Sequence, residues 1–79
     1  MTDQKTIDAF ERAAESAYAA MCEALPHNVK DCYEDAQLCF AHAVETANLA
    51  GLSDEVARLR SRMEHIRNVY NAQFRGVGR

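Results

Sequence analysis

The chain has 79 residues, of which 48% are apolar and 27% are charged, and its formal net charge is −3. This length fits one domain whose core only narrowly offsets the loss of conformational entropy, and the apolar fraction argues against disorder. There is no run of about 18 apolar residues, so the sequence does not predict a membrane-spanning helix.

The first predicted element is a helix over residues 3–25. Its apolar residues recur at alternating steps of three and four, which is the spacing of one helix face. Pro26 ends this helix, because a proline disfavours the helical conformation of the residue before it. The stripe contains Ile7, Phe10, Ala14, Ala17, Met21 and Ala24, with Tyr18 and Leu25 beside it.

A second helix is predicted over residues 29–50, with Asn28 as its N-cap. Leu38 and Leu49 fall on nearly the opposite side from the main apolar stripe, so this helix is apolar on more than one face. Gly51 supplies the left-handed residue that closes many helices. The main stripe contains Val29, Tyr33, Ala36, Phe40, Ala43, Ala47 and Ala50.

The third predicted helix covers residues 54–74, with Ser53 as its N-cap and acidic residues in its first turn. Residues 75–79 are expected to form a short flexible tail. The apolar stripe of this helix contains Val56, Leu59, Met63, Ile66 and Tyr70, widened by Val69 and Phe74.

Short connections make successive helices antiparallel neighbours, so the sequence predicts a single all-α domain over residues 1–79, built as an up-down-up bundle. An open hairpin that is completed by dimerisation is the alternative. The chain has no Trp and only three Phe and three Tyr. Because so few large side chains are available for a core, the sequence also predicts a homodimer in which a second copy adds buried area.

The sequence predicts no catalytic, cofactor or metal site. Cys32, Cys39 and His42 share one helix, but a structural zinc site uses paired ligands from two elements, so these cysteines are interpreted as small apolar residues. Phosphate-binding loops and nucleophile elbows are absent, and the chain is therefore expected not to be an enzyme. The odd number of cysteines and the lack of a signal-peptide pattern at the start favour the cytoplasm.

The charges are unevenly distributed. Residues 1–50 carry a net charge of −6 and residues 51–79 a net charge of +3. Arg58 and Arg62 follow one face of the third helix, and Arg60 and Arg67 follow another. We expect the arginines to form ion pairs with the acidic helices, and a small nucleic-acid-binding regulator is the alternative.

The surplus apolar surface of the second helix, formed by Leu38, Leu49 and Val44, predicts an interaction surface. The expected function is therefore a non-enzymatic helical module that binds another protein or itself, with no membrane partner. The opposing interpretation is that the bundle wraps round the middle helix and buries these residues. The candidate interaction residues are Leu38, Leu49, Arg58 and Arg62.

Overall fold

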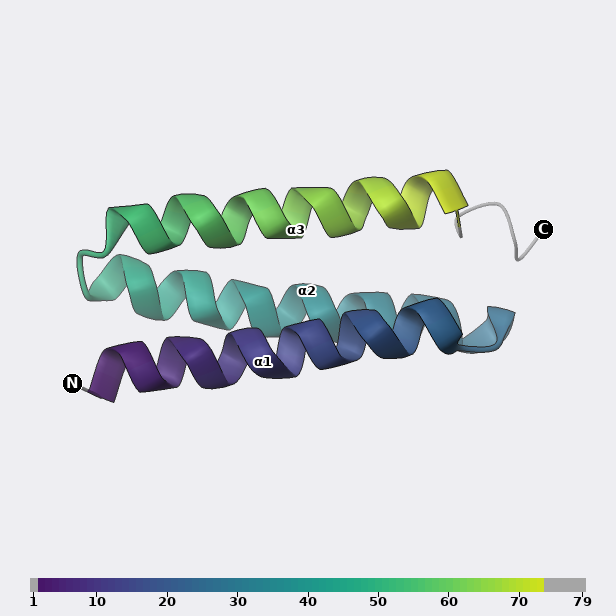
Figure 1. Cartoon of the computed structure of the whole chain (residues 1–79), viewed down its shortest axis with the longest axis horizontal. Coiled ribbons are helices and arrows are strands. Elements are labelled where there is room, and N and C mark those ends of the chain that lie inside the picture. The colour runs from purple at the N-terminus through teal and green to yellow at the C-terminus, as the bar shows by residue number, and fades with distance from the viewer. Residues whose placement is uncertain (1, 74–79) are drawn as a thin grey trace.

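The computed structural model describes residues 2–73 of the chain, and three helices make up most of this part. Helix α1 spans Thr2–Glu23, α2 spans Pro26–Leu49 and α3 spans Ser53–Gln73. The helices lie antiparallel along one another, with α2 between α1 and α3 (Figure 1). The predicted all-α bundle of three antiparallel helices is therefore confirmed. Phe74 and the predicted tail over residues 75–79 lie outside the described residues.

The core is formed by one stripe of side chains from each helix. Buried positions recur every seven residues, because seven residues are close to two helical turns and return a side chain to the same side. Burying a side chain the size of Leu contributes about 1.5–3 kcal/mol, so the largest core residues supply most of the hydrophobic stabilisation. These fully buried side chains are Ile7, Met21, Phe40, Leu59 and Ile66, all on the predicted stripes.

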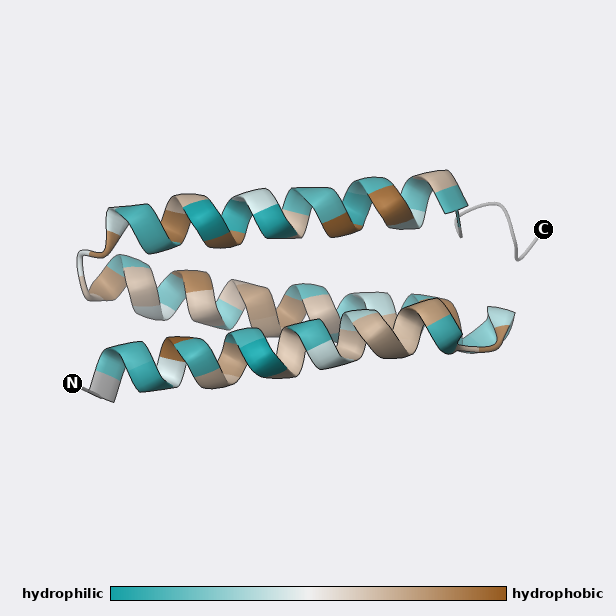
Figure 2. Ribbon diagram, viewed as in Figure 1, coloured by the Kyte–Doolittle hydropathy of each residue, from teal (hydrophilic) through white to brown (hydrophobic). Residues whose placement is uncertain are grey.

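Alanines set the distance between α1 and α2. Ala14 in α1 and Ala36, Ala43 and Ala47 in α2 are fully buried, and α1 approaches α2 more closely than α3 does. Helix α3 is the most hydrophilic of the three, with few hydrophobic positions along its length (Figure 2). Its contact with the core is made by larger side chains such as Leu59. Helices α1 and α3 do not approach closely, and long side chains link them.

The turn between α1 and α2 differs from the prediction. Helix α1 ends at Glu23 and α2 begins at Pro26, so the N-cap is Leu25, with φ −64° and ψ 151°. The prediction of Asn28 as N-cap was wrong, because Pro26 has a backbone angle suited to the first turn and lacks only an N–H that a helix start leaves unpaired. The N–H of Asn28 instead donates to the carbonyl oxygen of Leu25 at 2.8 Å.

The turn between α2 and α3 depends on Gly51, as predicted. Its φ of 74° lies in the left-handed region, which a residue without a Cβ adopts at little cost. The N–H of Gly51 donates to the carbonyl of Asn48 at 3.1 Å, and that of Leu52 donates to the carbonyl of Ala47 at 2.9 Å. These two bonds form a Schellman motif. Ser53 is the first residue of α3 rather than the cap before it.

Candidate interaction surface

Among the described residues, the exposed large apolar side chains are three leucines. The exposed fraction is 62% for Leu25, 57% for Leu38 and 83% for Leu49. Leu25 was expected beside the first apolar stripe, but α1 ends before reaching it. Val44, which the sequence grouped with Leu38 and Leu49, is instead half-buried against the core. The structure therefore leaves Leu38 and Leu49 accessible and removes Val44 from the candidate surface.

Leu38 belongs to a regular exposed stripe on α2, which we call the α2 outer face. Its positions repeat the three-and-four spacing of the buried stripe on the other side of the helix, and Leu49 lies beside its end. Leu38 and Leu49 are eleven residues apart, close to three full turns, so they lie on one side of α2 and about 16 Å apart along it. The face carries three carboxylates, and the exposed Lys30 adjoins it one turn before Glu34. Its residues, all exposed, are Asp31, Glu34, Leu38, Ala41, Glu45 and Asn48.

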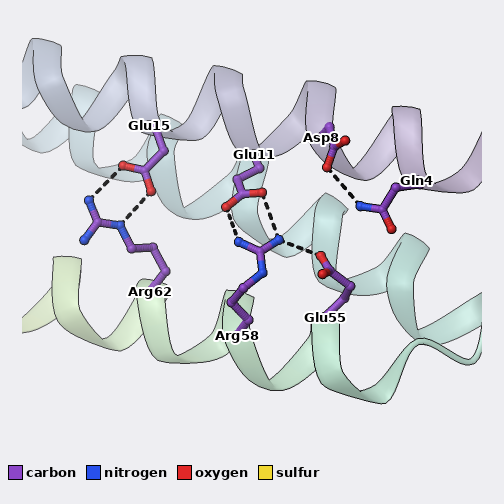
Figure 3. A network of polar contacts seen from close by, with 7 residues as sticks. All are labelled: Gln4, Asp8, Glu11, Glu15, Glu55, Arg58 and Arg62. Carbon is purple, nitrogen blue, oxygen red and sulfur yellow. Dashed lines mark hydrogen bonds and ion pairs between the residues drawn. The ribbon is translucent and has the colours of Figure 1, made fainter.

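Elsewhere on the bundle, an arginine of α3 joins a carboxylate of α1 (Figure 3). Arg58 donates hydrogen bonds from both Nη atoms to Glu11, with Nη2 3.0 Å from Oε1. The same Nη2 donates to Glu55, one turn earlier in α3. The bonds to Glu11 and Glu55 raise the pKa of Arg58, and the bond from Arg58 lowers the pKa of Glu55. Arg58 is thus held in its charged form by two carboxylates.

Arg62 forms a second link between α3 and α1, one turn further along. Its Nε and Nη2 atoms lie 2.6 Å and 2.9 Å from the two carboxylate oxygens of Glu15, and this hydrogen bonding raises the pKa of Arg62. The guanidinium carbon also lies 5.2 Å from the centre of the Tyr18 ring, at cation–π distance. Both members of the pair are 36% exposed, so we expect it to contribute only about 0–1 kcal/mol.

The structure therefore separates the four candidate residues into two groups. Leu38 and Leu49 are accessible on α2, whereas Arg58 and Arg62 are engaged with α1. A phosphate group that approached either arginine would compete with a carboxylate already bound through two hydrogen bonds. At Arg58 and Arg62 the geometry matches the expected pairing between the basic helix and an acidic one.

Two further arginines of α3, Arg60 and Arg67, lie beside a groove of about 360 Å³ between α2 and α3, which we call the arginine groove. Across it, the Gln37 amide donates to the carbonyl oxygen of Met63 at 3.1 Å. Within residues 2–73, neither arginine has a hydrogen bond or ion pair. The sequence placed them on a separate face of the helix but did not indicate that this face would be unpaired. The lining residues are Tyr33, Gln37, Arg60, Met63, Glu64 and Arg67.

The three cysteines are free thiols: Cys22 is exposed, and Cys32 and Cys39 are half-buried. Over residues 2–73, no three His, Cys, Asp or Glu side chains are placed so that they could share a metal ion. None of the helices described here combines the length and the apolar character needed to cross a bilayer.

Comparison of the chain with protein families, with characterised proteins and with solved structures finds no match.

Proposed function

We propose that this chain is a non-enzymatic helical interaction module, which binds another protein or a second copy of itself through the α2 outer face. The supporting observation is the second three-and-four stripe on α2, which has Leu38 and Ala41 at its centre and no partner within the described chain. Side chains with this spacing are suited to contact one facing helix.

The energetics favour a binding role for Leu38 and Leu49. Fully burying a leucine side chain contributes about 1.5–3 kcal/mol, and both of these side chains retain most of their accessible surface. The flanking carboxylates Glu34 and Glu45 would contribute selectivity, because they favour a partner with basic residues at matching positions. Since Cys22, Cys32 and Cys39 are free thiols, we extend the proposal to a reducing compartment such as the cytoplasm.

The test is affinity capture with the full chain as bait, using Leu38→Gln/Leu49→Gln as the binding variant. Gln has a helix propensity close to that of Leu, so the circular dichroism spectrum should be unchanged. Leu25→Gln is the matched control, because it makes the same substitution at an exposed leucine in the turn before α2, away from Leu38 and Leu49.

We expect the wild type and the control to retain a partner, or further copies of the chain, that the double variant loses. Identical binding by all three forms would contradict the proposed role of the α2 outer face.

A further inference from the structure

Helix α3 has an exposed stripe with the same three-and-four spacing, which we call the α3 outer face. It includes Arg60 and Arg67, whose guanidinium groups have no partner in the described chain. Glu64 lies between them, so the face has a net charge of +1, whereas the α2 outer face has a net charge of −3. Its residues, all exposed, are Ser53, Ala57, Arg60, Glu64, Arg67 and Asn71.

Contacts inside the chain fix which residues of α2 and α3 lie at the same height along the bundle axis, which we call their level. The Tyr33 ring stacks on the Tyr70 ring, and the Gln37 side chain bonds the backbone of Met63. The two helices run antiparallel (Figure 1), so residue numbers that increase along α2 are matched by residue numbers that decrease along α3. Glu34 therefore lies near the level of Arg67, and Ala41 lies near the level of Arg60.

We propose that the occupant of the α2 outer face is a second copy of this chain. A two-fold axis parallel to the helices relates the copies, so that α2 of each lies against α3 of the other. This inference rests on the proposed function and adds the identity and orientation of the partner. Helices α2 and α3 of both copies then form an antiparallel four-helix bundle, with α1 of each copy outside it.

The register supports this symmetry. Rotation about a two-fold axis parallel to the helices does not shift any residue along that axis. A residue of α2 is therefore level with the same α3 residues in the second copy as in its own copy. Glu34 then lies level with Arg67 of the second copy, and Glu45 lies within about one turn of Arg60 of the second copy. Small residues at Ala41 and Ala57 allow the helices to approach. Each contact occurs twice.

Charge favours this pairing over one that places two α2 outer faces together. Placing two α2 outer faces against each other would bring Asp31, Glu34 and Glu45 of one copy towards the same carboxylates of the other. Placing α2 against α3 brings a face of −3 towards a face of +1, and gives carboxylate partners to both unpaired arginines of the arginine groove. The chain therefore carries both halves of a complementary surface.

The proposed interface is of moderate size and largely polar. Two adjacent helices about 30 Å long and 10 Å wide present on the order of 600 Å² per copy. A standard stable interface buries about 800 Å² per partner. We therefore expect a reversible dimer whose affinity falls as salt screens the paired charges.

The experiment is sedimentation equilibrium of the full chain over a range of protein and salt concentrations. Arg67→Glu and Glu34→Arg should each weaken dimerisation by roughly tenfold or more, because each reversal affects two symmetry-related contacts. The combined Glu34→Arg/Arg67→Glu variant restores opposite charges at both contacts and should recover the dimer. Arg12→Glu and Asp35→Arg are the matched controls, since they reverse exposed charges outside both outer faces.

A chain that stays monomeric at all concentrations would overturn the inference, as would a dimer unaffected by the single reversals or not restored by the combined variant. The proposed function fails separately. If Leu38→Gln/Leu49→Gln abolishes binding of a different protein while the chain is monomeric, the interaction module stands and only self-association is wrong. If the double leucine variant binds everything that the wild type binds, the module itself is wrong.

Discussion

The rings of Tyr33 in α2 and Tyr70 in α3 stack with their centroids 4.1 Å apart and their planes inclined by 12°. Both side chains are half-buried, and the pair lies two turns from the end of the bundle at which α2 begins. Together with the bond from Gln37 to the backbone of Met63, this stack holds α3 in register on α2. The register matters because it determines which residues of the two outer faces lie level with one another.

The stacking should be measurable as a coupling energy. Tyr33→Leu and Tyr70→Leu retain apolar volume but remove one ring each. We expect the double variant to be less destabilised than the sum of the single variants, by about 0.5–1.5 kcal/mol, which is the contribution of an aromatic pair beyond its buried area. Urea unfolding of the four forms measures this difference. Strictly additive losses would show that the stack adds nothing specific.

Replacement of Phe40 tests the position of the core. Phe40→Ala should lower the free energy of unfolding by about 3–5 kcal/mol, because it removes the largest fully buried side chain and leaves a cavity. Leu38→Ala, two residues away on the exposed side, should change it by less than about 0.5 kcal/mol. Thermal unfolding followed by circular dichroism compares them. Similar losses in both variants would contradict the assignment of the buried and exposed faces.

Gly51 should resist replacement for a conformational reason. A Cβ at this position would meet no atom within 4 Å, so the cost of Gly51→Ala comes from its φ of 74° alone. We expect a destabilisation of about 1–2 kcal/mol, and a smaller one for Gly51→Asn, because Asn tolerates the left-handed region better than Ala. The two variants are compared by chemical denaturation, and an Ala variant as stable as the wild type would argue against this backbone conformation.

The Glu55 carboxylate should make stability depend on pH. The hydrogen bond from Arg58 lowers the pKa of Glu55 below its ordinary value of 4.5, so the folded state binds this proton less strongly than the unfolded state. The resulting stabilisation is present above pH 4.5 and is lost as the pH falls through the lowered pKa. Glu55→Gln should therefore flatten the acid side of the stability profile.

The acid titration is followed by denaturant unfolding at several pH values. Glu23→Gln serves as the control for removing an exposed carboxylate elsewhere on the surface. A Glu55→Gln profile that runs parallel to that of the wild type below pH 4.5 would show that the bond to Arg58 does not stabilise the fold.

Local patterns determined much of the fold. The three-and-four spacing around Phe40, Leu59 and Ile66 was sufficient to predict three helices and their buried sides, because a helical periodicity is a property of the chain alone. Gly51 likewise marked a turn without reference to the rest of the molecule. The first residue of α2 was predicted wrongly because Asn28 and Pro26 both favour a helix start nearby. The helix begins at Pro26, whose backbone angle suits the first helical turn.

Only the tertiary structure decided which arginines of α3 form ion pairs inside the chain. The sequence shows that Arg58 and Arg62 lie on one side of α3 and that Arg60 and Arg67 lie on another. It does not show which of these sides turns towards α1, because a helical period gives angles around one axis and no information about the neighbour on each side. The packing of Leu59 and Ile66 into the core fixes that rotation. This rotation places Arg58 and Arg62 against the carboxylates of α1. Arg60 and Arg67 then lie beside the open groove.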